Sequence, residues 1–250
     1  MSDTTSHSPI EADLLIRNIG QLVTMAQQPI EGASGPLGIV EHAAMASNKG
    51  IVCWIGRDDE VRQLFPAKTG KLRDELDAEG SVVTPGLVDS HTHLVFAGNR
   101  AAEFHLRRGG VTYGELLAQG KGILTTVQAT RSASDDELSD LALPRLESVR
   151  RYGTTTVEVK TGYGLSVEAE ERCLRIINGL SQLETAHKGP HIVPTFLGAH
   201  TLPPEYRNRR SDYVNLIIEE MLPRFAGLAK FCDVFCEREA FNLEESRRFR

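Results

Sequence analysis

The sequence lacks a long apolar run, an excess of positive charge and a secretory leader pattern. No hydrophobic stretch approaches the roughly 20 residues needed to cross a bilayer. The formal net charge of −6 argues against broad nucleic-acid binding, because no basic stripe is present to neutralise phosphates. Residues 1–15 have neither the basic start nor the apolar centre of a signal peptide. We therefore expect a cytoplasmic protein with no nucleic-acid partner and no membrane partner.

Cysteines are few, and their spacing does not indicate a metal knuckle or a disulfide framework. Cys232 and Cys236 are separated by three residues and have no second matched pair. We expect all four cysteines to be small buried hydrophobes in a reducing compartment. The glycine-containing stretch 119–122 lacks the upstream glycine and the following Ser or Thr of a phosphate-binding loop. The G-x-S-x-G elbow of many hydrolases is also missing.

The residue pattern changes near residue 84. Residues 1–84 contain short alternating segments with turn signals, which predict a small β-rich module, and "SNKG" at 47–50 predicts a hairpin turn. Residues 85–250 instead alternate strands with helices, with strands expected at 86–93, 154–162, 191–200 and 232–237. The last three strands recur about every 40 residues, the period of a βα unit.

These repeats indicate an α/β fold, the first half of a (β/α)8 TIM barrel. Four strands could also form a doubly wound sheet, but the chain stops just after a new helix begins, which favours a truncated barrel. Helices are expected at 132–153, 166–183 and 212–228, with capping boxes beginning at Ser134 and Asn242. Pro144 lies inside the first of these helices, so we expect a kink or a break near residue 143.

Two histidines stand at the end of the first barrel strand, in "PGLVDSHTH". Because side chains alternate along a strand, His91 and His93 point the same way, about 7 Å apart. Both could bind one cation, and neutral imidazole suits zinc and iron alike. The carboxyl end of a barrel strand is where active sites form. The other interpretation is a pair of ordinary polar residues.

Three further residues lie at or just after the carboxyl ends of the first three predicted barrel strands, next to the same candidate site. Arg100 follows the histidine pair and could hold a substrate carboxylate, or it could be a surface arginine. His200 ends the third strand and could bind metal, donate to a reacting carbonyl or cap a loop. Tyr163 lies between two glycines after the second strand and could bind a polar substrate or pack as an aromatic.

The remaining histidines and one lysine receive no role. His105, His187 and His191 have no partner at ligand spacing and are assigned as structural or solvated. Lys160 lies on the second strand, and a modified lysine bridges two metals in some barrels, but nothing else in the sequence requires a second metal.

The stretches "VVTPGLVDSHTHLVFAGNRAAEF", "GTTTVEVKTGYGL" and "PTFLGAH" resemble the imidazolonepropionase family of metal-dependent amidohydrolases, and the similarity extends over essentially the whole chain. The resemblance implies an amidohydrolase-type TIM barrel with a small N-terminal β-sandwich module. It also implies hydrolysis of the cyclic amide C–N bond of 4-imidazolone-5-propanoate to N-formimidoyl-L-glutamate, with one zinc or iron ion. The substrate is small and anionic, and a homodimer is possible at full length.

By the same resemblance, individual residues acquire expected roles. His91 and His93 match metal ligands, Arg100 matches the residue that holds the propionate, and Tyr163 and His200 match substrate contacts, with His200 also the catalytic helper at the carbonyl. Tyr113 is a weaker match to a substrate contact. The family's other ligands, a histidine and an aspartate, would lie beyond Arg250, so the 250 residues alone are expected to be inactive. Another amidohydrolase, such as a deaminase of a cyclic base, and an inactive fragment remain the alternatives.

Overall fold

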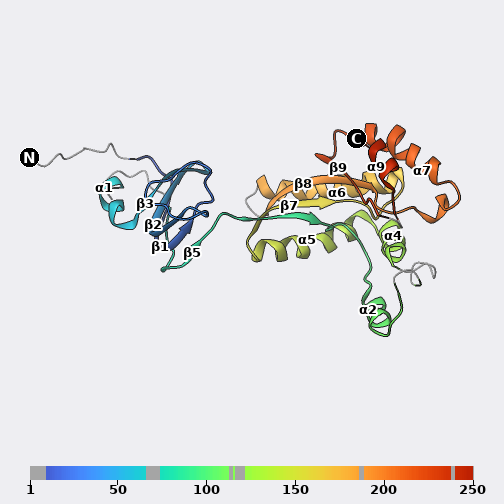
Figure 1. The fold of residues 1–250 in the computed structure, drawn as a ribbon, viewed down its shortest axis with the longest axis horizontal. Helices are drawn as coiled ribbons and strands as arrows, with labels where there is room; N and C mark the ends of the chain where they lie inside the picture. The colour runs from blue at the N-terminus through green and yellow to red at the C-terminus, as the bar shows by residue number, and fades with distance from the viewer. Residues whose placement is uncertain are drawn as a thin grey trace, which may run out of the picture. The chain divides into compact units, whose positions relative to one another are not determined.

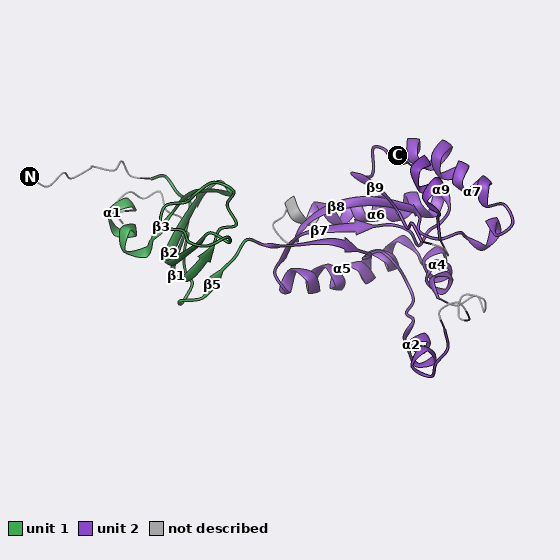
Figure 2. Cartoon of the chain, viewed as in Figure 1, with its two compact units in different colours: residues 1–85 green, residues 86–250 purple. Residues whose placement is uncertain are grey.

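The chain divides into two compact units, residues 1–85 and residues 86–250 (Figure 2). The structure, a computed structural model, describes residues 10–65, 74–112, 115, 122–185, 189–237 and 240–249. Among these described residues, no helix combines the length and the apolar character that a membrane span requires.

Unit 1 is built on one five-stranded sheet in the order β3-β2-β1-β4, with β5 also pairing with β1. Strands β1, β2 and β3 pair antiparallel, whereas β4 and β5 run parallel to β1. The predicted hairpin is confirmed between β2 and β3, where Lys49 and Gly50 take φ values of 53° and 79°. The elements are β1 Leu14–Val23, β2 Ile39–Asn48, β3 Ile51–Arg57, a 3₁₀ turn Asp58–Glu60, α1 Val61–Leu64, β4 Asp74–Asp77 and β5 Val82–Val83.

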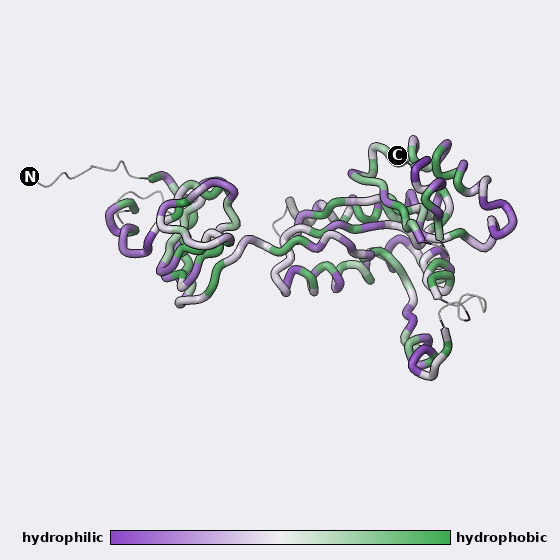
Figure 3. The backbone as a smooth tube through the Cα atoms, viewed as in Figure 1, coloured by the Kyte–Doolittle hydropathy of each residue, from purple (hydrophilic) through white to green (hydrophobic). Residues whose placement is uncertain are grey.

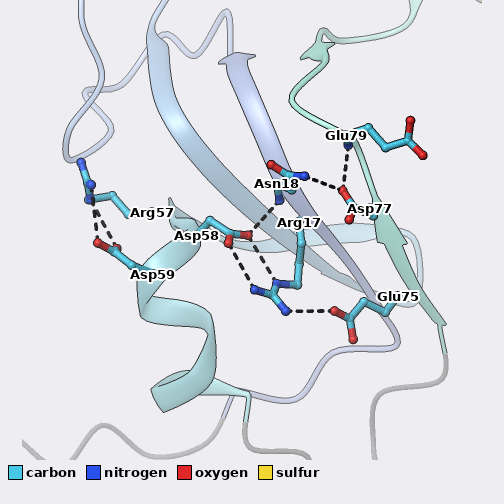
Figure 4. Close-up of polar contacts among 8 residues, drawn as sticks. All are labelled: Arg17, Asn18, Arg57, Asp58, Asp59, Glu75, Asp77 and Glu79. Carbon is cyan, nitrogen blue, oxygen red and sulfur yellow. Dashed lines mark hydrogen bonds and ion pairs between the residues drawn. The ribbon is translucent and has the colours of Figure 1, made fainter.

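A carboxylate holds an irregular point in β1 (Figure 4). Asn18 has a φ of 51° at the place where the pairing of β1 with β2 shifts register. Asp58 accepts its backbone N–H at 2.8 Å and an Nη2–H of Arg17 at 3.2 Å. Burial raises the pKa of Asp58, but these hydrogen bonds outweigh burial and lower it. Asp58 therefore stays charged and stabilises the bulge.

Unit 2 contains four parallel strands in the order β6-β7-β8-β9 (Figure 1). Each strand is followed by helical segments before the next strand, so the unit is an α/β half-barrel, as predicted. The strands are β6 Leu87–Thr92, β7 Thr154–Lys160, β8 His191–Ala199 and β9 Phe231–Val234. The helical segments are α2 Ala101–Arg108, α4 Ile123–Ser132, α5 Asp135–Arg151, α6 Val167–Thr185, a 3₁₀ turn Pro204–Tyr206, α7 Arg210–Leu216, a π turn Ile217–Met221, α8 Leu222–Phe225 and α9 Leu243–Arg248.

One face of this sheet packs on α5 and α6. Hydrophobic and hydrophilic stretches alternate along α5, as expected for a helix with one buried side (Figure 3). Val157 and Val159 of β7 are fully buried in this core. The predicted apolar face of α6 is buried at its first four positions, Cys173, Ile176, Ile177 and Leu180, while the side chain of the fifth, Leu183, lies outside the described residues.

Two local predictions are wrong in part. The expected break near residue 143 does not occur, because helix α5 continues through Pro144, with Leu138, Ala142 and Leu146 buried on both sides of it and holding the helix in place. Cys173 is buried as expected, but the other three cysteines are exposed. The predicted caps at Ser134 and Asn242 are present, each accepting the N–H of a glutamate three residues on.

Candidate functional site

The predicted site residues gather at the carboxyl ends of adjacent parallel strands. His91 lies on β6 and His93 follows its last residue, while Tyr163 lies in the loop after β7 and His200 directly follows β8. Parallel pairing aligns these strand ends, with Thr92 opposite Val159. Side chains that are far apart in the sequence therefore meet at one edge of the sheet.

The four aromatic rings of His91, His93, Tyr163 and His200, here called the ring cluster, form a continuous group centred on His93. The centroid of the His93 ring lies 5.7 Å from that of His91, 4.9 Å from that of Tyr163 and 5.0 Å from that of His200. The His93 and His200 rings are stacked with an interplanar angle of 7°. The structure thus brings together all four ring residues that the sequence singled out.

His93 is held as a neutral imidazole. Its pKa is lowered to about 3, first by burial and then by the neighbouring His200, His91 and Lys160, against a backbone hydrogen bond with Thr161. Its Nδ1 is buried and has no hydrogen-bond partner among the described residues. A buried nitrogen with a lone pair or proton to satisfy needs a ligand, and the neutral ring is the form that binds metals.

The tautomer of His200 follows from its backbone contact. Its Nδ1 lies 2.9 Å from the carbonyl oxygen of Gly162, which can only accept a hydrogen bond. Nδ1 must therefore carry the proton, and in the neutral ring Nε2 is an acceptor. Burial lowers the pKa of His200, which favours this neutral form. The predicted donation to a carbonyl oxygen therefore requires a second proton, at Nε2.

Arg100 occupies a different setting. Within the described part of the chain its contact is with Glu103 and not with the ring cluster: its Nε donates to Oε2 of Glu103 at 2.8 Å. Glu103 is buried and also accepts from the backbone N–H of Gly122 and the hydroxyl of Thr125. One edge of the guanidinium is thereby fixed by a carboxylate that is itself anchored. Tyr113, the weaker predicted contact, lies outside the described residues.

Lys160 does not carry the features of a metal-bridging lysine. Its Nζ donates to Oε1 of Glu158 at 2.6 Å and to Oδ2 of Asp233 at 3.0 Å. Burial lowers the pKa of Lys160, but these two carboxylates outweigh burial and raise it. The amine therefore stays protonated, and a protonated amine has no lone pair for a metal or for a modifying carbonyl.

A single metal ion would find part of a ligand set here. Among the described residues, no three His, Cys, Asp or Glu side chains lie close enough to enclose an ion. Two features nonetheless suit His91 and His93 to share one ion: their rings are adjacent on one strand end, and Nδ1 of His93 is buried without a partner. The residues fit a metal site that is completed by other ligands.

Comparison with known proteins gives a specific relationship. No family model matches the chain. An imidazolonepropionase of Symbiobacterium thermophilum is 50% identical over 240 residues, which cover 94% of this chain and 55% of that protein. One of Myxococcus xanthus is 45% identical over 238 residues, with the same coverage of both. The chain is a relative of the imidazolonepropionases. It spans about half the length of these curated relatives.

Solved structures show a likeness in fold. An atrazine chlorohydrolase of Arthrobacter aurescens, in a structure complexed with zinc, superimposes with a TM-score of 0.54 at 15% identity, covering 94% of this chain and 49% of that chain. A triazine hydrolase, also from A. aurescens, gives the same TM-score and identity over 96% of this chain and 50% of that chain. These likenesses support the α/β half-barrel described above.

Two glutamates that support the predicted site were missed from the sequence. Glu103 follows Arg100 by three residues, the spacing of side chains on one helix face, which is a usable signal for an ion pair. Glu170 is fully buried beneath the loop that carries Tyr163. Its position on the apolar stripe of α6, three residues before Cys173 and seven before Ile177, was the available signal.

Proposed function

We propose that the full protein containing this chain is an imidazolonepropionase. It would hydrolyse the cyclic amide C–N bond of 4-imidazolone-5-propanoate and release N-formimidoyl-L-glutamate. The observation that carries the proposal is 50% identity to an imidazolonepropionase over 94% of the chain, since that alignment includes all five predicted site residues. The ring cluster supports it, because it places three histidines together at the carboxyl ends of parallel strands.

In this proposal His91 and His93 hold one zinc or iron ion. Such an ion, when bound, supplies an activated water and polarises the carbonyl of the substrate ring. The donors are two imidazoles, which both metals accept. The remaining ligands would come from the part of the relatives' length that this chain does not cover. Residues 85–250 would then be the first half of a complete (β/α)8 barrel, and residues 1–84 part of a small β-sandwich.

The other predicted residues would bind and orient the substrate. Arg100 would pair with the propionate through the part of its guanidinium that Glu103 does not occupy. Tyr163, in contact with both His93 and His200, would border the substrate ring. His200 would act through Nε2, which accepts a hydrogen bond or a proton in the neutral ring and donates to the carbonyl oxygen once it is protonated. A small anionic substrate and a cytoplasmic location complete the proposal.

The test is a substrate comparison with the full-length protein loaded with zinc or with iron. We expect 4-imidazolone-5-propanoate to be consumed and N-formimidoyl-L-glutamate to appear in equal amount by mass spectrometry. Cytosine, a cyclic base without a carboxylate, should release no ammonia, because it offers nothing for Arg100 to hold. Ammonia release from cytosine without ring opening of the imidazolone would instead favour a deaminase and contradict the proposal.

A further inference from the structure

Helix α6 carries a fully buried carboxylate directly beneath the loop that bears Tyr163. Glu170 has no exposed surface. Its Oε1 accepts the backbone N–H groups of Gly164 and Leu165, both at 2.8 Å, and its Oε2 accepts that of Gly162 at 3.1 Å. The side chain of Thr161 adds a fourth hydrogen bond. All four donors belong to residues 161–165.

Burying a carboxylate in this position costs folding free energy unless hydrogen bonds compensate for the lost water. Glu170 stands on the apolar stripe of α6, with Cys173, Leu174 and Ile177 all fully buried beside it. A leucine would satisfy the packing of such a stripe, whereas a buried charge must be compensated by hydrogen bonds. Burial raises the pKa of Glu170, and the hydrogen bonds from Thr161 and the three backbone donors oppose this rise without reversing it. The compensation comes entirely from one loop.

That loop has a backbone conformation that needs support. Gly162 has a φ of 108° and the buried Leu165 has a φ of 54°, a left-handed conformation that leucine rarely adopts. A Cβ at Gly164 would lie 2.6 Å from the backbone of Ala169 and Glu170, so the loop rests directly on the start of α6. The donors to Glu170 are the N–H groups that this unusual conformation turns inward. Glu170 thus stabilises a loop that would otherwise relax.

The same loop makes contact with the ring cluster on its other side. The backbone N–H of Gly162 donates to Glu170, and its carbonyl oxygen accepts a hydrogen bond from Nδ1 of His200. Tyr163, the next residue, has its ring 4.9 Å from that of His93 and 5.4 Å from that of His200. A shift of the Gly162 backbone would therefore move Tyr163 and release Nδ1 of His200 together.

We infer that Glu170 is a positioning residue, which fixes the backbone of residues 161–165 and through it the placement of Tyr163 and the Nδ1–H tautomer of His200. It touches neither the substrate nor the metal ligands. Its kinetic consequence rests on the proposed function, whereas its effect on the loop rests on the hydrogen bonds alone. Loss of Glu170 should leave metal binding intact and misplace two substrate contacts.

The test compares Glu170→Gln with Glu171→Gln in the full-length metal-loaded protein. Glu171 is the matched control because it is the neighbouring glutamate on α6 and pairs with Arg175 and Arg224 instead of the loop. In Glu170→Gln an amide NH₂ group replaces one of the two carboxylate oxygens. The backbone N–H groups of the loop that donated to that oxygen therefore lose their acceptor. Amide exchange in residues 161–166 should accelerate about 10- to 150-fold, the ratio expected when a charge-assisted hydrogen bond is lost.

The kinetic arm separates positioning from general destabilisation. For Glu170→Gln we expect kcat to fall about 100-fold, as for a reacting group misplaced by about 1 Å. KM should change less, because the Arg100 contact is untouched, and metal content should equal that of the wild type. The further effect of Tyr163→Phe should largely disappear in the Glu170→Gln background, because a displaced tyrosine has little left to lose. The Glu171→Gln variant should match the wild type in amide exchange, kcat, KM and metal content, and it should leave the effect of Tyr163→Phe unchanged.

If Glu170→Gln does not fold, Thr161→Val and Thr161→Ser provide the same comparison with a smaller change, since only valine removes the hydroxyl. Unchanged exchange of the loop in the variant, or faster exchange with wild-type kcat, would overturn the inference while leaving the proposed function intact. If the wild type does not open the imidazolone ring, the proposed function fails, and the exchange measurement alone decides whether Glu170 holds the loop.

Discussion

Replacing His91 or His93 with glutamine in the full-length protein is expected to remove most of the bound metal and to lower kcat by more than about 100-fold. Loss of an outer partner of a metal ligand already costs about 10- to 100-fold in affinity or activity, so loss of a ligand should cost more. The two rings lie at the same strand end with their centroids 5.7 Å apart. Each substitution therefore removes one donor to the same ion. Metal content is measured by plasma mass spectrometry and kcat with 4-imidazolone-5-propanoate.

The matched control is His105→Gln, because His105 is an exposed histidine on α2, outside the ring cluster. It should retain full metal content and the wild-type rate. Glutamine is chosen over alanine so that the partly buried His93 position keeps most of its volume and a folding defect does not imitate metal loss. Full metal occupancy in both the His91 and His93 variants would show that this pair is not a metal site.

For Arg100→Met we expect a loss of about 10- to 150-fold in kcat/KM, corresponding to a charge-assisted hydrogen bond of roughly 1.5–3 kcal/mol. Methionine keeps much of the length of the side chain and removes the charge. If the propionate only anchors the ring, KM should rise and kcat should change little. If the bound tail also orients the carbonyl, kcat should fall as well. Steady-state kinetics over a range of substrate concentrations separates the two.

Arg100 also pairs with the buried Glu103, which accepts a hydrogen bond from Gly122 at the start of α4. A displaced loop in the Arg100 variant could therefore imitate the loss of binding to the substrate carboxylate. An imidazolone lacking the carboxylate distinguishes a loop defect from loss of the substrate contact. If Arg100 binds the carboxylate, this compound should be a poor substrate for the wild type and no worse for the variant. An exposed arginine on the same helix, changed as Arg108→Met, should leave both substrates unaffected. An equal penalty on both compounds would mean that Arg100 supports the loop.

Much of unit 2 could be predicted because its signals are local. The βα period, the β-branched residues of β7 and the apolar stripe of α6 each depend on residues close together in the sequence, and each appears where it was expected. The meeting of His93, Tyr163 and His200 could also be predicted, since parallel strands place their carboxyl ends at one edge. Alternation along one strand was enough for His91 and His93.

The supporting hydrogen bonds could not be predicted in the same way. A glutamate in a helix is usually solvated; the apolar stripe of α6 indicates that Glu170 is turned inward, but nothing in the sequence shows that it meets the backbone of a loop. The tautomer of His200 depends on the carbonyl of Gly162, a contact across 38 residues that only the folded loop creates. At Pro144 a local signal misleads instead: proline favours a helix break, but the tertiary packing of α5 keeps the helix continuous.

Anomalous X-ray diffraction from crystals of the full-length protein tests most directly whether the ring cluster belongs to the proposed metal site. Data collected on both sides of the zinc and iron absorption edges identify the ion and its place. We predict one anomalous peak about 2.0–2.1 Å from an imidazole nitrogen of both His91 and His93, the ordinary zinc–nitrogen distance. A metal peak elsewhere in the molecule, with neither imidazole in contact with it, would contradict the account.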